Sequence, residues 1–277
     1  MFVWLASYPK SGNTWLRAAL WSLRADGGAV DLADLSAVGT RLWKRRTFER
    51  VLGVESSELT EDEIDTLRPL AIAALGAKLR EKTPQKLHDA WRRTTAGDPI
   101  LPASVTAGAI YVVRDPRAVA PSWAHHSAIS IDRAITCLAN PDASLAPIAA
   151  DFGTPHLPER LLTWSQHVES WLDGPSQPPT VIRYEDMIED PGRELTRAAR
   201  VLEWPTDPAT VENAVAATRF DVLRAAEDRS GFLEKAPGVT VFFRRGAADG
   251  WREELTAEQA RRIERDHGRV MQRLGYL

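Results

Sequence analysis

The chain has 277 residues with a formal net charge of -3 at pH 7, 44% hydrophobic residues and 26% charged residues. This length can bury one large core, so we expect an ordinary globular protein with a single domain spanning residues 1–277. The small negative charge gives no general attraction to nucleic acid or to an anionic membrane, so a site for an anion must be built locally.

Several other functional classes are disfavoured by what the sequence lacks. No apolar run approaches the roughly 20 residues that span a bilayer, and no basic segment precedes an apolar one at the N-terminus. Cys137 is the only cysteine, which excludes an intramolecular disulfide and a cysteine metal cluster. No histidine spacing indicates a zinc site. We therefore expect a cytoplasmic protein with no metal and no membrane partner; the oligomeric state is not readable from the sequence.

The first predicted element is a buried strand at residues 2–6, which leads through a short turn into an amphipathic helix with apolar residues at helical spacing over 16–23. A helix N-terminus offers unpaired N–H groups and a partial positive charge. Lys10 and the hydroxyls of Ser11 and Thr14 would complete a cradle for an anion. The sequence therefore predicts a phosphate-binding turn between strand and helix.

The next segments alternate between irregular stretches and helices. Residues 26–58 show no clear period, and we interpret them as a loop with short helices over the mouth of the site. Thr60 and Glu63 form a capping box that starts a helix extending to Arg80.

Three further strands are expected, one ending near His88 and the others at 110–113 and 180–184. Asp115 and Pro116 suit the cap and first residue of the helix after 110–113, and another helix occupies 191–202. Strands that alternate with helices favour an α/β fold, with a mostly parallel central sheet flanked by helices.

The remaining segments are predicted less sharply. Residues 140–158 are interpreted as a surface loop before a helix at 158–172, and 229–250 as irregular chain. Thr256 and Gln259 form a second capping box at the start of the last helix.

Residues 8–15, YPKSGNTW, depart from the G-x-x-x-x-G-K-[ST] loop of nucleoside triphosphate enzymes, because the lysine precedes the glycine. This stretch instead resembles the 5′-phosphosulfate loop of sulfotransferases that use 3′-phosphoadenosine 5′-phosphosulfate (PAPS). The resemblance implies a P-loop-like sulfotransferase fold. It also implies that these residues contact the cofactor: Lys10, Ser11, Gly12, Asn13, Thr14 and Trp15.

Two more segments resemble the parts of that family that hold the 3′-phosphate. In YVVRDPRAVAPSW, at residues 111–123, the matching positions are Arg114 and Ser122. An arginine just past a buried strand offers a planar fork of donors at the sheet edge where α/β folds bind ligands. The segment FRRGAADGW, at 243–251, is similar to the family's C-terminal basic motif. The positions implied there are Arg244, Arg245 and Gly246, with arginine at 245 where lysine is more usual and Asp249 where glycine is common.

The adenine end of the cofactor is implied by two shorter matches. Tyr184 lies in a segment that resembles the family's tyrosine-glutamate-aspartate element. Thr218 and Phe220 resemble its threonine-serine-phenylalanine element, with Arg219 in place of the small residue. With Trp15, these residues would flank the base by stacking and edge contacts.

Lys86-Leu87-His88 resembles the family's lysine-threonine-histidine strand end, whose histidine is the general base. The resemblance implies that His88 removes the acceptor proton, that Lys86 lies near the transferred group, and that Lys10 stabilises the departing phosphate oxygen. A lone histidine is more often structural. The position of His88 at a strand end, with Lys86 two residues earlier and directed to the same side, favours the catalytic interpretation.

The implied reaction is metal-free sulfuryl transfer from PAPS to a hydroxyl, or less favourably an amine, of a small-molecule acceptor such as an aromatic or natural-product alcohol, leaving 3′-phosphoadenosine 5′-phosphate (PAP). A nucleotide kinase of related fold and a non-catalytic binder of the bisphosphate nucleotide are the alternatives. The acceptor pocket is expected from loops 26–58, 124–158 and 229–243. Four aromatic residues either line it or belong to the core: Trp43, Phe48, Trp123 and Phe232.

Overall fold

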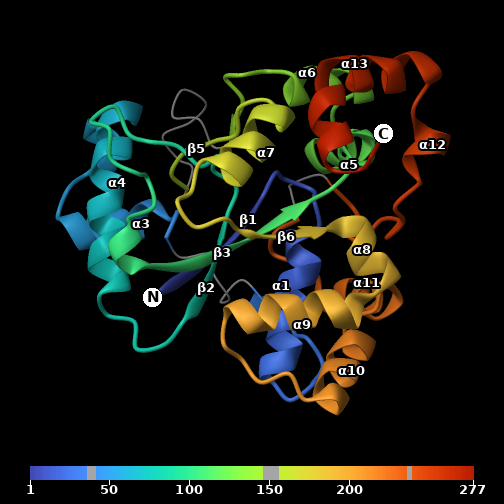
Figure 1. The fold of residues 1–277 in the computed structure, drawn as a ribbon, viewed down its shortest axis with the longest axis horizontal. Helices are drawn as coiled ribbons and strands as arrows, with labels where there is room; N and C mark the ends of the chain where they lie inside the picture. The colour runs from blue at the N-terminus through green and yellow to red at the C-terminus, as the bar shows by residue number, and fades with distance from the viewer. Residues whose placement is uncertain (36–41, 146–155, 236–238) are drawn as a thin grey trace.

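The computed structural model describes residues 1–35, 42–145, 156–235 and 239–277. Its central sheet has four parallel strands in the order β2-β1-β3-β6 (Figure 1). Their bounds are β1 Phe2–Ser7, β2 Thr83–Leu87, β3 Thr106–Val113 and β6 Thr180–Arg183. The α/β fold with a parallel sheet flanked by helices is therefore confirmed.

Side chains of β1 alternate between two cores because successive residues of a strand point to opposite faces. Val3 and Leu5 pack with α1 (Asn13–Arg24), α9 (Pro191–Val201) and α10 (Pro208–Ala217). Trp4 and Ala6 face the opposite core, to which α4 (Glu61–Gly76), α5 (Pro116–Ser127), α7 (Trp164–Asp173) and α13 (Ala257–Arg273) contribute. The helices thus form a layer on each side of the sheet (Figure 1).

The remaining elements are short or peripheral. They are α2 Leu32–Leu35, α3 Arg45–Leu52, η1 Ser56–Glu58, η2 Ala103–Val105, α6 Ile131–Leu138, β4 Ser144–Leu145, β5 Glu159–Arg160, α8 Tyr184–Glu189, α11 Phe220–Ser230 and α12 Trp251–Glu254. The short strands β4 and β5 pair antiparallel in a separate sheet.

Local capping signals locate several helix starts. The capping boxes at Thr60 and Thr256 are both present, and the Asp115 carboxylate accepts a hydrogen bond from the backbone N–H of Arg117. The prediction of a helix from residue 158 was wrong: α7 begins at Trp164, after a third capping box formed by Thr163 and Gln166.

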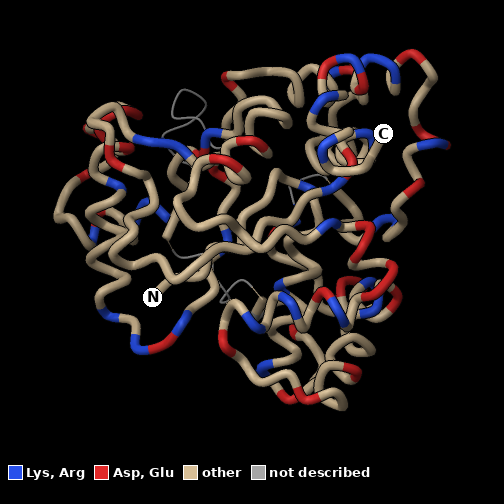
Figure 2. The backbone as a smooth tube through the Cα atoms, in the orientation of Figure 1, with Lys and Arg blue, Asp and Glu red and all other residues tan. Residues whose placement is uncertain are grey.

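Basic and acidic positions intermingle along the helices (Figure 2), in keeping with the small net charge. Among the described residues, no helix combines the length and the apolar character needed to cross a bilayer. In the same part of the chain, no group of three or more histidine, cysteine, aspartate or glutamate side chains is arranged to hold a metal ion.

Candidate functional site

The site is built around the turn that joins β1 to α1. Lys10 has φ 68° and Gly12 has φ 103°, so the chain passes through the left-handed region twice within three residues. A Cβ at Gly12 would lie 2.5 Å from Cδ2 of Tyr184, which leaves no room for any other residue. The close contact with Tyr184 fixes this turn at the start of α1, where a helix leaves backbone N–H groups without intrahelical partners.

One cavity of about 500 Å³ opens over the carboxyl ends of the strands. Fourteen of the sixteen predicted site residues line it: Lys10, Gly12, Asn13, Thr14, Trp15, Lys86, His88, Arg114, Ser122, Tyr184, Phe220, Arg244, Arg245 and Gly246. The two that do not are Ser11 and Thr218. The fold therefore brings together motifs that are more than two hundred residues apart in the chain.

The two exceptions differ in kind. Ser11 is fully buried in the turn, and its Oγ has no hydrogen-bond partner among the described residues. A buried hydroxyl of this kind fits a site whose anion would complete its bonding. Thr218 instead donates its hydroxyl to the carbonyl of Ala214 at 2.7 Å, and its own carbonyl accepts from Nε1 of Trp15 at 2.9 Å. Its role in this structure is to orient Trp15.

Lys10 is the basic residue of the turn. Burial, followed by the charges of Arg114 and Lys86, lowers the pKa of Lys10 to about 7. Its Nζ lies 4.0 Å from the centre of the Phe242 ring. An anion bound at the turn would favour the protonated lysine, so this group is poised to change charge on binding.

His88 is held in one tautomer. Its Nδ1 lies 2.8 Å from the carbonyl oxygen of Ser7. A carbonyl can only accept, so Nδ1 carries the hydrogen and Nε2 keeps its lone pair. Burial and then the charge of Lys86 lower the pKa of His88 well below its usual value, which keeps the ring neutral. A neutral imidazole with a free Nε2 is the form required of a general base.

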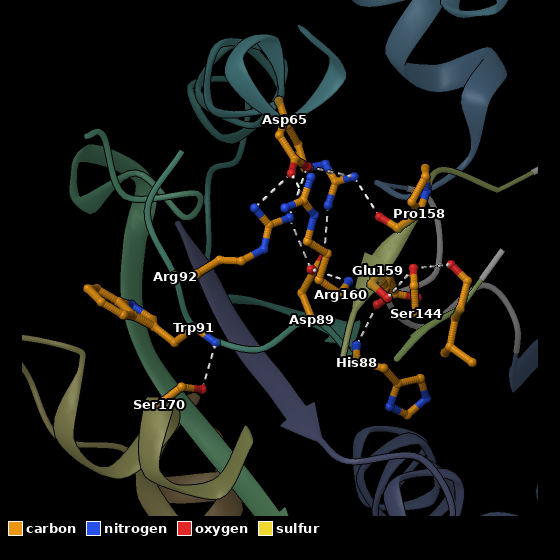
Figure 3. A network of polar contacts seen from close by, with 12 residues as sticks. Asp65, His88, Asp89, Trp91, Arg92, Ser144, Pro158, Glu159, Arg160 and Ser170 are labelled. Carbon is orange, nitrogen blue, oxygen red and sulfur yellow. Dashed lines mark hydrogen bonds and ion pairs between the residues drawn. The ribbon is translucent and has the colours of Figure 1, made fainter. Parts of the chain in front are cut away.

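Behind His88 lies a network of polar contacts (Figure 3). The buried carboxylate of Asp89 accepts from Arg68 at 2.6 Å, from Arg92 at 3.3 Å and from the backbone N–H of Arg160 at 2.8 Å. These contacts tie the end of β2 to α4 and β5. His88 is therefore positioned by neighbours on both sides.

Glu234 is a site residue that the sequence interpretation missed. Its carboxylate accepts from Nη2 of Arg17 at 2.7 Å and from Nζ of Lys86 at 3.1 Å. The two cations outweigh the opposing effect of burial and lower the pKa of Glu234 to about 2. An ionised carboxylate on the cavity wall is thus shared by Arg17 and Lys86.

Arg114 connects the two ends of the site. Its Nη1 donates to the carbonyl of Lys10 at 3.3 Å and its Nη2 to the carbonyl of Ala247 at 3.0 Å. The guanidinium lies 4.2 Å from the centre of the Tyr184 ring, and its buried Nε has no partner among the described residues. Arg114 and Ser122 line the cavity together, as the sequence predicts.

The basic segment near the C-terminus closes the same cavity. Arg244 forms a two-pronged ion pair with Glu254 at 2.6 and 2.7 Å, and Arg245 binds Glu253 at 3.0 Å. A Cβ at Gly246, which has φ 64°, would lie 2.3 Å from the Phe220 ring. Glycine is therefore required where this loop crosses the aromatic residue.

The expected acceptor pocket is corrected in part. No described residue of 26–58 lines the cavity. Trp43 and Phe48 are buried in cores, Phe48 because α3 packs on α4, and Phe232 packs in the core beneath α11. Trp123 does line the cavity. The other two expected loops do contribute to the wall, 124–158 through His126 and Leu157, and 229–243 through Phe242 and Phe243. Glu159, which also lines the cavity, was missed.

Comparison with known proteins places this site in context. The family model described as a sulfotransferase domain matches residues 2–275. Sulfotransferase 1A1 of Canis lupus familiaris is 25% identical over 119 residues, which are 41% of this chain and 40% of that protein. Sulfotransferase 1E1 of Mus musculus is 24% identical over 256 residues, which are 90% of this chain and 76% of that protein.

Solved structures share the fold. A mouse sulfotransferase complexed with PAP has a TM-score of 0.60 at 18% identity, covering 98% of this chain and 84% of that chain. Retinol dehydratase in complex with androsterone and PAP has a TM-score of 0.52 at 17% identity, covering 98% of this chain and 80% of that chain. Because the family match extends over nearly the whole sequence, the chain belongs to the sulfotransferase domain family.

Proposed function

We propose that this protein, acting as a single domain over residues 1–277, transfers a sulfuryl group from PAPS to a hydroxyl, or less favourably an amine, of a small-molecule acceptor. The observation that carries the proposal is the neutral His88, with Nε2 free, in the same cavity as Lys10 and the anion-binding turn. A protein that only binds the nucleotide does not require a general base beside the anion-binding turn.

The residues present fit the nucleotide. The buried Oγ of Ser11 and Nε of Arg114 lack partners among the described residues, and no side-chain hydrogen bond caps the start of α1 there. The turn would hold the 5′ end, Arg114, Ser122 and the segment 244–246 the 3′-phosphate, and Trp15 and Phe220 the base. Solved structures of similar fold that contain PAP support the choice of nucleotide.

The cofactor supplies an activated sulfuryl group. His88 takes the acceptor's hydroxyl proton on Nε2 as the new oxygen–sulfur bond forms, and such base catalysis contributes about 10²- to 10⁴-fold. Lys10 would stabilise the negative charge that develops on the phosphate oxygen of the departing nucleotide. Lys86, held by Glu234, presents fixed positive charge beside the reacting groups.

The acceptor is proposed to be a small aromatic or natural-product alcohol. Trp123, Leu157 and Phe242 give part of the wall an apolar surface suited to such a molecule. We keep the expectations of a metal-free reaction, a cytoplasmic location and no nucleic-acid partner as parts of the proposal.

Thermal unfolding tests the cofactor directly. PAP without metal should stabilise the protein by about 2.7 kcal/mol at a hundred times its dissociation constant, because it binds only the folded state. Adenosine triphosphate with magnesium is the comparison. Stabilisation by the triphosphate alone would refute the proposal and favour a nucleotide kinase.

A further inference from the structure

Glu159 of β5 is a carboxylate on the cavity wall that the proposed chemistry does not use. Its Oε2 accepts the backbone N–H of His88 at 2.5 Å (Figure 3). Both residues line the same cavity. The carboxylate is therefore fixed beside the residue that is proposed to take the acceptor's proton.

Glu159 has no cationic partner in the described residues. Two cations act on it through space, but each is committed to another carboxylate: Lys86 binds Glu234 at 3.1 Å and Arg68 binds Asp89 at 2.6 Å. No ion pair joins Glu159 to a lysine or arginine in the part of the chain that the structure describes. The negative charge of ionised Glu159 on the cavity wall is therefore not balanced by an ion pair among the described residues.

The surroundings of Glu159 disfavour its charged form, which a bound cation would stabilise. Burial and then the charge of Asp89 raise the pKa of Glu159 to about 7, against the lowering effects of the His88 N–H, Lys86 and Arg68. Burial also lowers the pKa of His126 to about 4 and lowers that of His156, so both wall histidines are neutral near pH 7. Lys86 is paired with Glu234, although its charge still acts on Glu159 through space.

We propose that Glu159 is a specificity-determining residue that binds the ammonium group of an amino alcohol or aminophenol whose hydroxyl is presented to His88. Glu159 and His88 line the same cavity, so a single small molecule can contact both side chains. The remaining apolar wall, with Trp123, Leu157 and Phe242, suits the carbon skeleton. This inference rests on the proposed function and narrows its acceptor class.

Calorimetric titration with two matched phenols tests the assignment. Meta-hydroxybenzylamine and meta-ethylphenol have the same number of non-hydrogen atoms and differ in the ammonium group. At about pH 8, where Glu159 is ionised, the amine should bind at least about tenfold more tightly, as expected for a charge-assisted hydrogen bond. At about pH 6 the advantage should largely disappear, and amine binding near pH 7 should release a proton.

Glu159→Gln keeps an oxygen for the His88 N–H but removes the charge. This variant should lose the preference for the amine while binding ethylphenol as the wild type does. The control is Asp62→Asn, which removes an exposed carboxylate that binds Arg160 at 2.9 Å from outside the cavity. This control should leave the preference unchanged.

Two results would overturn the inference: equal binding of the two phenols by the wild type at about pH 8, or a preference that survives in Glu159→Gln. If Glu159→Gln does not fold, the pH comparison in Lys10→Met decides the matter, because this variant removes the other group of the cavity that changes charge near pH 7. Titrations are made first without nucleotide and then with PAP. Failure of PAP to bind would refute the proposed function, while the comparison of the phenols would still be readable.

Discussion

Replacing Glu234 by alanine should destabilise the protein strongly, because the substitution leaves two cations without their shared partner. The Arg17 side chain is 0% exposed and that of Glu234 is 18% exposed. Removing one partner of a buried pair costs about 3 to 5 kcal/mol. A carboxyl with a pKa of about 2 in the fold, against an ordinary value of 4.5, gives a similar figure of about 3 kcal/mol.

This stability has a defined pH range. The folded-state pKa of Glu234 is depressed, so its contribution is fully present above the ordinary carboxyl pKa and is lost as the pH falls towards about 2. Near pH 7 the contribution is therefore complete. For a chain of this length, a loss of about 3 kcal/mol corresponds to a decrease in Tm of roughly 5 °C.

Thermal unfolding followed by circular dichroism near pH 7 measures the effect. The control is Asp173→Ala, which breaks an exposed ion pair with Arg273 and should cost less than about 1 kcal/mol. The double variant Arg17→Met with Glu234→Met should recover part of the loss, because it leaves no buried guanidinium unpaired. A Tm for Glu234→Ala as close to the wild type as that of the control would refute the reasoning.

Three further predictions concern the proposed reaction. His88→Ala should reduce turnover by about 10²- to 10⁴-fold with PAP affinity within about twofold of the wild type; near-normal turnover would contradict the role of the base. Because the pKa of Lys10 is about 7, PAP affinity measured by calorimetry should fall as pH rises above about 7, with uptake of a proton that Lys10→Met abolishes. Proton uptake that persists in Lys10→Met would show that Lys10 is not the group that takes up the proton. Gly12→Ala should lower PAP affinity at least tenfold, since its Cβ would meet Tyr184. Gly97→Ala is the matched control, because Gly97 also has a positive φ, of 88°, but nothing lies within 4 Å of its added Cβ. Equal losses of PAP affinity in the two variants would contradict the role of the contact with Tyr184.

The residues that form the turn and the helix caps could be identified from the sequence, because their roles depend on near neighbours. Lys10 and Gly12 belong to a turn of a few residues, and Thr60 and Thr256 each cap a helix through a residue three positions later. The parallel sheet followed from strands that alternate with helices. The Thr163 capping box could also be identified from the sequence. Because it was overlooked, the helix was predicted to begin at residue 158 and not at Trp164.

Only the tertiary structure decided which distant groups meet. Glu234 binds Arg17 across 217 positions of sequence, and it lies in a segment without periodicity. Glu159 gains its place beside His88 because β5 runs past the end of β2, 71 positions earlier in the chain. Thr218 matched a motif, yet its hydroxyl bonds to its own helix. Which charges pair and where a side chain points depend on how distant segments pack. The conformation of a turn and the cap of a helix depend on residues close together in the sequence.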